Sequence, residues 1–382
     1  MTEALMLWVL WAIACGGALV AWRMHAEEDV RAADGQERLL FVGSSRSAEA
    51  LVREIERRPA LHWRVLGLVA DRTSGAPPPI GPWLGPIADL PAIIASTCPT
   101  RLVLAPAVRR SRARAAQQTL LDARLAGIAA GRARDLIERV TGKLPIERLT
   151  PRHLLDAPGF DHADVTISDP MHHVARLYSA AGAAIGLLLT APLLGLIALA
   201  IQLDSPGPAI FVQERLGMGG RTFRLYKFRT MRESHGPRSE WVSDNSDRIT
   251  RVGRWLRRFR LDELPQLVNV LDGDMNLVGP RPHPSSNGPL FLARIPHYRL
   301  RFAVRPGLTG WAQVRYGYAN SLEEEIEKMR YDLYYIKHRS MAFDLRILAA
   351  TLWTLVFDGR NHEAAQEAPS AVVWSAHWGT LR

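Results

Sequence analysis

Two long apolar runs mark the chain. Residues 5–22 (LMLWVLWAIACGGALVAW) contain no charged residue, and as a helix they are long enough to cross the ~30 Å apolar core of a bilayer. Glu3 precedes the run and Arg23 follows it, so the positive-inside bias predicts an N-terminus outside and the following chain in the cytoplasm. The pattern predicts a transmembrane anchor over residues 1–22, with a buried core helix as the alternative.

The second apolar run, residues 177–201, contains Pro192. Proline removes a backbone donor and clashes with the preceding turn, so the helix should break or kink there into two arms too short to cross alone. Both flanks are basic, with Arg176 before the run and Arg215 after it. We therefore expect a re-entrant membrane helix over residues 177–203, with a kinked spanning helix as the alternative.

Between the two runs, strand-like segments alternate with segments of helical spacing. In chain order these are residues 38–43, 48–57, 65–71, 87–96, 101–105 and 110–128. Such alternation favours parallel strands with crossover helices, so residues 23–170 are interpreted as a Rossmann-like α/β domain. Gly43 keeps one glycine of the dinucleotide pattern G-x-G-x-x-G, but Ser45 replaces the glycine that admits a pyrophosphate. The alternative is a structural or regulatory domain that kept the sheet.

The composition narrows the class of protein. The 382 residues are 47% hydrophobic and 23% charged, which excludes a disordered or collagen-like chain. Their net charge of +10 indicates anionic partners, although the basic residues are scattered beside membrane segments and no nucleic-acid recognition motif occurs. Cys15 and Cys98 lie far apart in unlike contexts, so neither a disulfide framework nor a cysteine metal cluster is expected.

Candidate chemistry follows the second apolar run. Residues 213–231 (QERLGMGGRTFRLYKFRTM) place a glycine-rich turn before a strand-like alternation that includes Lys227 and Arg229. Cations on one strand face can converge on a phosphate, although a solvated face is the common alternative. Asp262 and Glu263 directly precede an early helical proline, Pro265, with Arg257 nearby, an environment that favours an ionised carboxylate able to attack a phosphoryl group. A helix cap is the alternative.

Further segments could complete such a site. Arg281 stands between two prolines on a rigid turn suited to holding a guanidinium against a phosphate. Residues 305–314 (RPGLTGWAQV) suit either a phosphate-lined wall or a tight structural connection. Asp332 is either a second metal ligand or one half of a buried ion pair. Residues 343–357 are interpreted as an amphipathic helix at the membrane surface or a core helix.

The chain resembles the bacterial sugar transferase family of monotopic polyprenyl-phosphate sugar-1-phosphate transferases. The resemblance rests on a proline-broken helix followed, in order, by the motifs YKFRTM, LDELPQL, GDMNLVGPRP and RPGLTGWAQV. The resemblance covers nearly half the chain. It implies a mostly helical catalytic domain over residues 171–360 at the cytoplasmic face of the bacterial inner membrane. The remaining residues, 361–382, are interpreted as a polar tail. Ala191 stands where the family often has serine before the proline, and one N-terminal membrane helix is found where longer members have several.

The resemblance also implies an activity and its residues. The reaction would transfer a sugar-1-phosphate from a UDP-sugar to undecaprenyl phosphate with Mg²⁺, releasing UMP, as the first membrane step of exopolysaccharide, capsule or O-antigen synthesis. Asp262 would form a covalent phosphosugar intermediate, and Glu263 would help to bind the metal. The implied phosphate-binding set is Arg215, Lys227, Arg229, Arg257 and Arg281. Membrane lipids are expected partners and a homodimer is compatible. The alternative is a membrane-anchored nucleotide-sensing or scaffold protein acting through the Rossmann-like domain.

Overall fold

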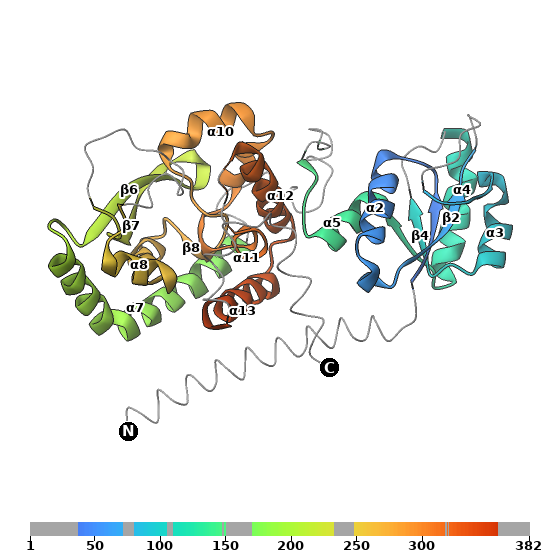
Figure 1. Ribbon diagram of the computed structural model, residues 1–382. Helices are drawn as coiled ribbons and strands as arrows, with labels where there is room; N and C mark the ends of the chain where they lie inside the picture. The colour runs from blue at the N-terminus through green and yellow to red at the C-terminus, as the bar shows by residue number, and fades with distance from the viewer. Residues whose placement is uncertain are drawn as a thin grey trace, which may run out of the picture. The chain divides into compact units, whose positions relative to one another are not determined.

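The computed structural model describes residues 37–71, 80–104, 110–146, 149, 170–232, 248–317, 319 and 321–357. The chain divides into two compact units, Met1–Lys143 and Leu144–Arg382 (Figure 1). The predicted anchor over residues 1–22 and the predicted tail lie outside the described residues. Leu144 and Ile146 belong to the second unit, because both are buried in its core.

The described part of the first unit is built on a parallel sheet, which confirms the predicted α/β class. Its strands are β1 (Arg38–Val42), β2 (Arg64–Val69), β3 (Trp83–Gly85), β4 (Arg101–Leu104) and β5 (Ala129–Arg132), in the order β3-β2-β1-β4-β5. In the central strand, Leu40 faces Gly67 of β2 and Leu102 of β4. The short outer strands β3 and β5 were not predicted from the sequence.

Alternate side chains of the central strand point to opposite faces of the sheet. Leu39 and Phe41 pack under α2 (Arg46–Glu56) and α5 (Ala133–Thr141), whereas Leu40 and Val42 pack under α3 (Leu90–Thr97) and α4 (Arg110–Leu125). Figure 1 shows one helix pair on each side of the sheet. Helices on both faces bury the apolar strands, as parallel sheets require.

At the end of β1, the turn that keeps one dinucleotide glycine closes on its own helix. The Ser45 hydroxyl accepts a hydrogen bond from the Ala48 backbone amide at 3.1 Å and caps α2. That amide is one of the donors that a phosphate would use at a helix N-terminus. In the structure, the turn therefore serves as a helix cap.

The second unit is mostly helical around two small sheets. Its main elements are α7 (Pro170–Asp204), β6 (Ile210–Leu216), β7 (Thr222–Phe228), α8 (Arg251–Arg258), α9 (Gln266–Asp272), β8 (Asn276–Val278), α10 (Gly288–Arg294), β9 (Gly307–Thr309), α11 (Trp311–Arg315), α12 (Leu322–His338) and α13 (Met341–Phe357). β6 and β7 form an antiparallel hairpin, and β8 pairs in parallel with β9. The largest core cluster surrounds α12.

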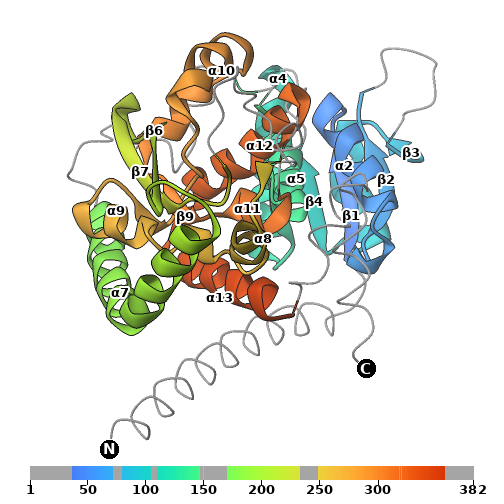
Figure 2. The ribbon, with the colours of Figure 1, turned by 60° about the vertical axis from the view of Figure 1, so that its left-hand side comes forward.

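Helix α7 is continuous through Pro192 but bends midway along its length (Figure 2). In the arm before the proline, Ala183 packs in a cluster with Leu267 of α9. In the arm after it, Ile201 packs in a cluster with Leu256 of α8. Of the predicted break or kink, the structure shows a bend, since the missing amide of one proline interrupts the helical hydrogen bonds only locally.

The outer surface of α7 is apolar and exposed, with large side chains on both sides of Pro192. The exposed ones are Val174, Leu177, Ile185, Leu188, Leu189, Leu193, Leu196, Leu199 and Leu203. Among the described residues, α7 is the one helix long and apolar enough to cross a membrane. So large an exposed apolar face indicates an apolar partner, such as the interior of a bilayer.

Polar contacts fix the first arm of α7 to the rest of the unit. Arg176 donates hydrogen bonds to the Val270 and Leu271 carbonyls at the end of α9. The Ser179 hydroxyl accepts a hydrogen bond from the Leu277 amide at 3.0 Å, and Tyr178 donates one to Asp344 of α13. Asp344 is buried and Leu345 on the same helix is exposed, so α13 has one face in the core and one outside it.

The glycine-rich segment 305–314, for which two roles were open, forms a tight structural connection. A Cβ on Gly307 would overlap the backbone of Gly279, and a Cβ on Gly310 would overlap the Gly279 carbonyl. Glycine is required at these positions because the two backbones approach too closely for any side chain. The connection brings β9 against β8 and so fixes the chain that leads into Arg281.

Candidate active site

Asp262 and Glu263 lie on a short turn between two helices, as their position before Pro265 predicted. Helix α8 ends at Arg258, and Arg260 adopts a left-handed conformation with φ 52° that reverses the chain. A 3-10 turn, Leu261–Glu263, follows, and Pro265 precedes the first residue of α9. Non-glycine residues seldom adopt positive φ, and such strained positions cluster at functional sites.

The Glu263 carboxylate is held by Arg281. The two guanidinium nitrogens of Arg281 donate to the two carboxylate oxygens at 2.6 and 3.3 Å. Burial opposes ionisation of Glu263, but the charge of Arg281 and its hydrogen bonds outweigh that effect, so the pKa of Glu263 lies below its ordinary value. Glu263 is therefore a fixed anion.

The neighbouring Asp262 differs sharply from Glu263. Its carboxylate forms no hydrogen bond or ion pair with any residue that the structure describes. Burial and the adjacent charge of Glu263 raise the pKa of Asp262 to about 6, against the opposing charges of Lys227, Arg257 and Arg281. The pKa of Glu263 thus lies below its ordinary value and that of Asp262 above it, because at Asp262 burial outweighs the surrounding cations. With a pKa of about 6, Asp262 is still mostly ionised at neutral pH.

Lys227 belongs to the same electrostatic cluster as Asp262. Its ammonium lies 5.0 Å from the centre of the Phe211 ring, across the β6–β7 hairpin. Burial lowers the pKa of Lys227 to about 8, the positive charge of Arg215 acts in the same direction, and Asp262 opposes both. At neutral pH the site therefore holds a desolvated cation near an unbonded carboxylate.

The hairpin is held beside the carboxylate turn by Asn269 of α9, which is fully buried. Its side-chain oxygen accepts from the Tyr226 amide at 3.0 Å, and its side-chain nitrogen donates to the Arg224 carbonyl at 2.6 Å. The Asn269 side chain thereby uses both its acceptor and its donor group on the backbone of β7. This bridge fixes the strand that carries Lys227 against the helix that follows Asp262.

Arg257 and Arg215 complete the predicted basic set around these side chains. Arg257 lies on α8, donates to the Thr230 hydroxyl at 2.9 Å, and contributes positive charge at Asp262. Arg215 donates to the Pro282 carbonyl at 2.8 Å and contributes positive charge at Lys227. Both therefore lie in the cluster, and both also hold neighbouring protein groups.

Arg229 does not join this cluster, and we correct its assignment as a phosphate-binding residue. Its buried guanidinium donates to the Pro206 carbonyl at 2.5 Å and to the carbonyl and hydroxyl oxygens of Ser205 at 2.6 and 3.1 Å. Ser205 directly follows α7, whose last carbonyls lack helical partners. Arg229 therefore caps the chain as it leaves α7.

Asp332 is likewise placed by the structure as an ion-pair residue rather than a metal ligand. It is 2% exposed and pairs with Arg301 at 2.9 Å. Of the two alternatives that the sequence left open, the structure shows the buried ion pair. Sequence reasoning missed Arg301 altogether, since it lies outside every recognisable motif and its partners are distant along the chain.

The carboxylate turn suits a magnesium ion that is shared with a substrate. Among the described residues there is no cluster of three or more metal-ligating side chains. Mg²⁺ commonly uses one or two carboxylates and takes its other ligands from water and substrate phosphates. The unbonded carboxylate of Asp262, next to Glu263, fits that requirement.

Comparison with known proteins covers the part of the chain that carries the site. A family model described as bacterial sugar transferase matches residues 171–358, which include every residue of the cluster. The glucose-1-phosphate transferase of Caulobacter vibrioides, named for UDP-glucose and undecaprenyl phosphate, is 47% identical over 184 residues. Those residues are 47% of this chain and 69% of the relative.

Two further relatives differ in length and in name. A protein of Aeromonas hydrophila, named as an undecaprenyl-phosphate N-acetylgalactosaminephosphotransferase, is 39% identical over 61% of this chain and 53% of its own. The exopolysaccharide production protein PSS of Rhizobium leguminosarum is 41% identical over 46% of this chain and 91% of its own. The chain thus spans about half the length of the Aeromonas relative and nearly all of the Rhizobium one.

Proposed function

This chain belongs to the bacterial sugar transferase family, and from that premise we propose that it transfers a sugar-1-phosphate from a UDP-sugar to undecaprenyl phosphate. The observation that carries the proposal is the contrast within the carboxylate pair. Asp262 is unbonded beside a desolvated lysine, whereas Glu263 is held by Arg281. An unbonded carboxylate among cations is suited to nucleophilic attack on a phosphorus atom.

The chemistry runs in two displacement steps. A carboxylate oxygen of Asp262 attacks the sugar-bearing phosphorus of the UDP-sugar, and the bond from that phosphorus to the bridging oxygen breaks, releasing UMP. A phosphate oxygen of undecaprenyl phosphate then attacks the phosphorus held on Asp262. The acyl phosphate bond breaks, so the products are undecaprenyl-diphosphate-sugar and the free carboxylate. A soluble donor and a lipid acceptor can therefore use the same site in turn.

The basic side chains offset the negative charge of the carboxylates and of the diphosphate in this reaction. Lys227, Arg257 and Arg281 place positive charge around the carboxylate that the anionic diphosphate must approach. A bound Mg²⁺ would be held by Asp262 and Glu263 and would neutralise charge on the diphosphate. Arg281 fixes Glu263 in one orientation, so this anion stays in place while Asp262 reacts.

We further propose that α7 is re-entrant and that the site lies at the cytoplasmic face of the inner membrane. The bend midway along α7 and its exposed apolar side chains support this placement (Figure 2). With Cys15 and Cys98 replaced by serine, His173→Cys and Arg221→Cys should both react with an impermeant maleimide from the cytoplasmic side. Labelling of the two positions from opposite sides would establish a spanning helix instead.

UMP release tests the activity directly. Membranes carrying the chain are supplied with Mg²⁺ and either UDP-glucose, UDP-galactose or UDP-N-acetylgalactosamine, with and without undecaprenyl phosphate, beside an Asp262→Asn control. We expect a UDP-hexose to be the donor, turnover to require the lipid, and the variant to release no UMP. Release that is unchanged in Asp262→Asn would refute the carboxylate mechanism.

A further inference from the structure

The backbone around Arg281 is held at every carbonyl of a four-residue segment, 280–283. The acceptor–donor pairs, in order, are Pro280 with the Gly307 amide at 3.0 Å, Arg281 with Arg301 Nη2 at 2.7 Å, Pro282 with Arg215 Nη1 at 2.8 Å, and His283 with the Leu216 amide at 2.9 Å. Two of these four donors are arginine side chains. The segment that aims the Arg281 guanidinium is therefore fixed by side chains distant along the chain.

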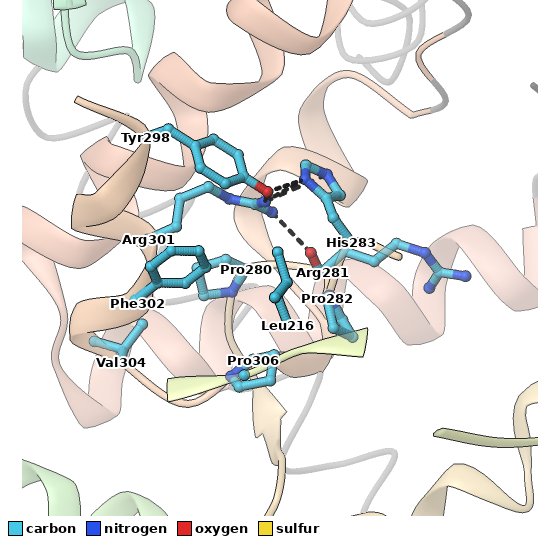
Figure 3. A pocket seen from close by; sticks show the side chains of 11 residues that line it. Leu216, Pro280, Arg281, Pro282, His283, Tyr298, Arg301, Phe302, Val304 and Pro306 are labelled. Carbon is cyan, nitrogen blue, oxygen red and sulfur yellow. Dashed lines mark hydrogen bonds between the residues drawn. The ribbon is translucent and has the colours of Figure 1, made fainter. Parts of the chain in front are cut away.

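Arg301 is the buried member of this set. It is 6% exposed and lies on the 3-10 segment Tyr298–Ala303. One terminal nitrogen donates to His283 Nδ1 at 2.6 Å, and the other is shared between the Arg281 carbonyl and the Asp332 carboxylate. In Figure 3 the Arg301 guanidinium lies between Tyr298, His283 and the Arg281 carbonyl, while the Arg281 side chain points away from them.

The partners of Arg301 are themselves fixed. Burial lowers the pKa of His283 to about 3, and the charge of Arg301 acts in the same direction, so the ring is neutral. Because an arginine only donates, Nδ1 must accept and Nε2 must carry the proton. Nε2 then donates to Glu325, which lies 3.2 Å away and is paired with Lys328 at 3.3 Å. Asp332 supplies the countercharge that a buried guanidinium requires.

We infer that Arg301 is a positioning residue that acts through the backbone of Arg281. By holding the Arg281 carbonyl, Arg301 sets where the Arg281 guanidinium meets Glu263 and the phosphates of the donor. The inference rests on the proposed function, because the effect of this alignment is on the rate of phosphoryl transfer. A displacement of about 1 Å in such a group can lower the rate about 100-fold.

A double-variant cycle tests the inference with full-length protein in detergent. The variants are Arg301→Lys, which keeps the buried charge but has no planar guanidinium to span the three partners, Arg281→Lys, and the two together. Glu327→Gln, which breaks the Glu327–Arg330 pair on α12, is the matched control. The readouts are kcat and KM for the UDP-sugar, and the rise in melting temperature that UDP induces.

If Arg301 acts through Arg281, Arg301→Lys lowers kcat about 10–100-fold, and the double variant is no slower than Arg281→Lys alone. The UDP-induced rise should likewise decrease to the same level in all three variants, and Glu327→Gln should resemble the wild type. Independent losses that multiply in the double variant would overturn the inference.

The variant Asp332→Asn tests the positioning role of Arg301 in a second way. It leaves Arg301 in place without its countercharge, and we expect it to lower kcat more than it raises KM in the protein that remains folded. A loss confined to melting temperature, with kcat unchanged, would reduce the Arg301–Asp332 pair to a purely structural role. If the wild type binds UDP but turns over no UDP-sugar, the proposed function fails, and the UDP-induced rise still decides the positioning role.

Discussion

Arg281 places two nitrogens on the two carboxylate oxygens of Glu263, at 2.6 and 3.3 Å, while Asp262 next to it in sequence is unbonded among the described residues. One carboxylate of the pair is thus restrained and the other is available. In the proposed mechanism, Glu263 is the group that stays in place and Asp262 is the one that forms and breaks a bond.

Replacing Arg281 by glutamine should affect both folding and catalysis. Arg281→Gln leaves the Glu263 charge buried without its partner, and we expect the free energy of unfolding to decrease by about 1–3 kcal/mol. We expect kcat/KM to decrease at least about 100-fold. Chemical denaturation and UMP release measure the two effects. Adding Glu263→Gln should restore stability but not activity, and a double variant less stable than Arg281→Gln would contradict this explanation.

Asp262→Asn should give a protein that is inactive but more stable at alkaline pH. The pKa of Asp262 is about 6 in the folded chain against an ordinary value of 3.8, so the protonated form favours folding. The free energy of unfolding of the wild type therefore decreases as pH rises from about 4 to about 6 and is level above. In buffer with a metal chelator, the variant should be more stable by about 1–3 kcal/mol at pH 8 and equal to the wild type at pH 4. A variant less stable at pH 8 would show that burial is not the dominant cause.

Lys227→Arg should remove the alkaline limb of the pH profile. Since the pKa of Lys227 is about 8, its ammonium loses its proton as pH rises through that value, and kcat/KM should then fall about tenfold per pH unit. Arginine stays charged throughout this range. We expect the variant to keep roughly 1–10% of activity at pH 7 and to show no decline up to pH 9.5. An alkaline limb unchanged by the substitution would assign the titration to another group.

Arg229→Lys should affect stability rather than substrate binding. A lysine cannot reach the two Ser205 oxygens and the Pro206 carbonyl together, so we expect the free energy of unfolding to decrease by about 1–3 kcal/mol. Melting in detergent, with and without UDP, measures the effect. KM for the UDP-sugar should be unchanged, and a KM raised tenfold in a stable variant would return Arg229 to the phosphate-binding set.

The sequence could locate the carboxylate turn because its signals are local. Pro265 marks the start of a helix, so the placement of Asp262 and Glu263 before it follows from the order of residues alone. Lys227 and Arg229 show where local pattern fails. Alternation places both on one face of a strand, but β7 ends at Phe228, and beyond it Arg229 turns to the end of α7.

Burial and long-range pairing could not be predicted from the local sequence pattern. The arginines near Asp262 are visible in the sequence, whereas the burial that outweighs them in setting its pKa is a property of the packed unit. Arg301 is similar, because nothing in its neighbours indicates that it will meet His283 and Asp332. Such residues become recognisable only when segments distant along the chain are brought together.

The bend of α7 links the two helices that flank the carboxylate turn. One arm packs on α9 and the other packs on α8, and Asp262 lies on the turn between those two helices. A change in the angle between the arms would therefore open or narrow that turn. If α7 enters the bilayer as proposed, the length of the lipid chains would set how far the bent helix must reach, and membrane thickness would then influence the geometry around Asp262.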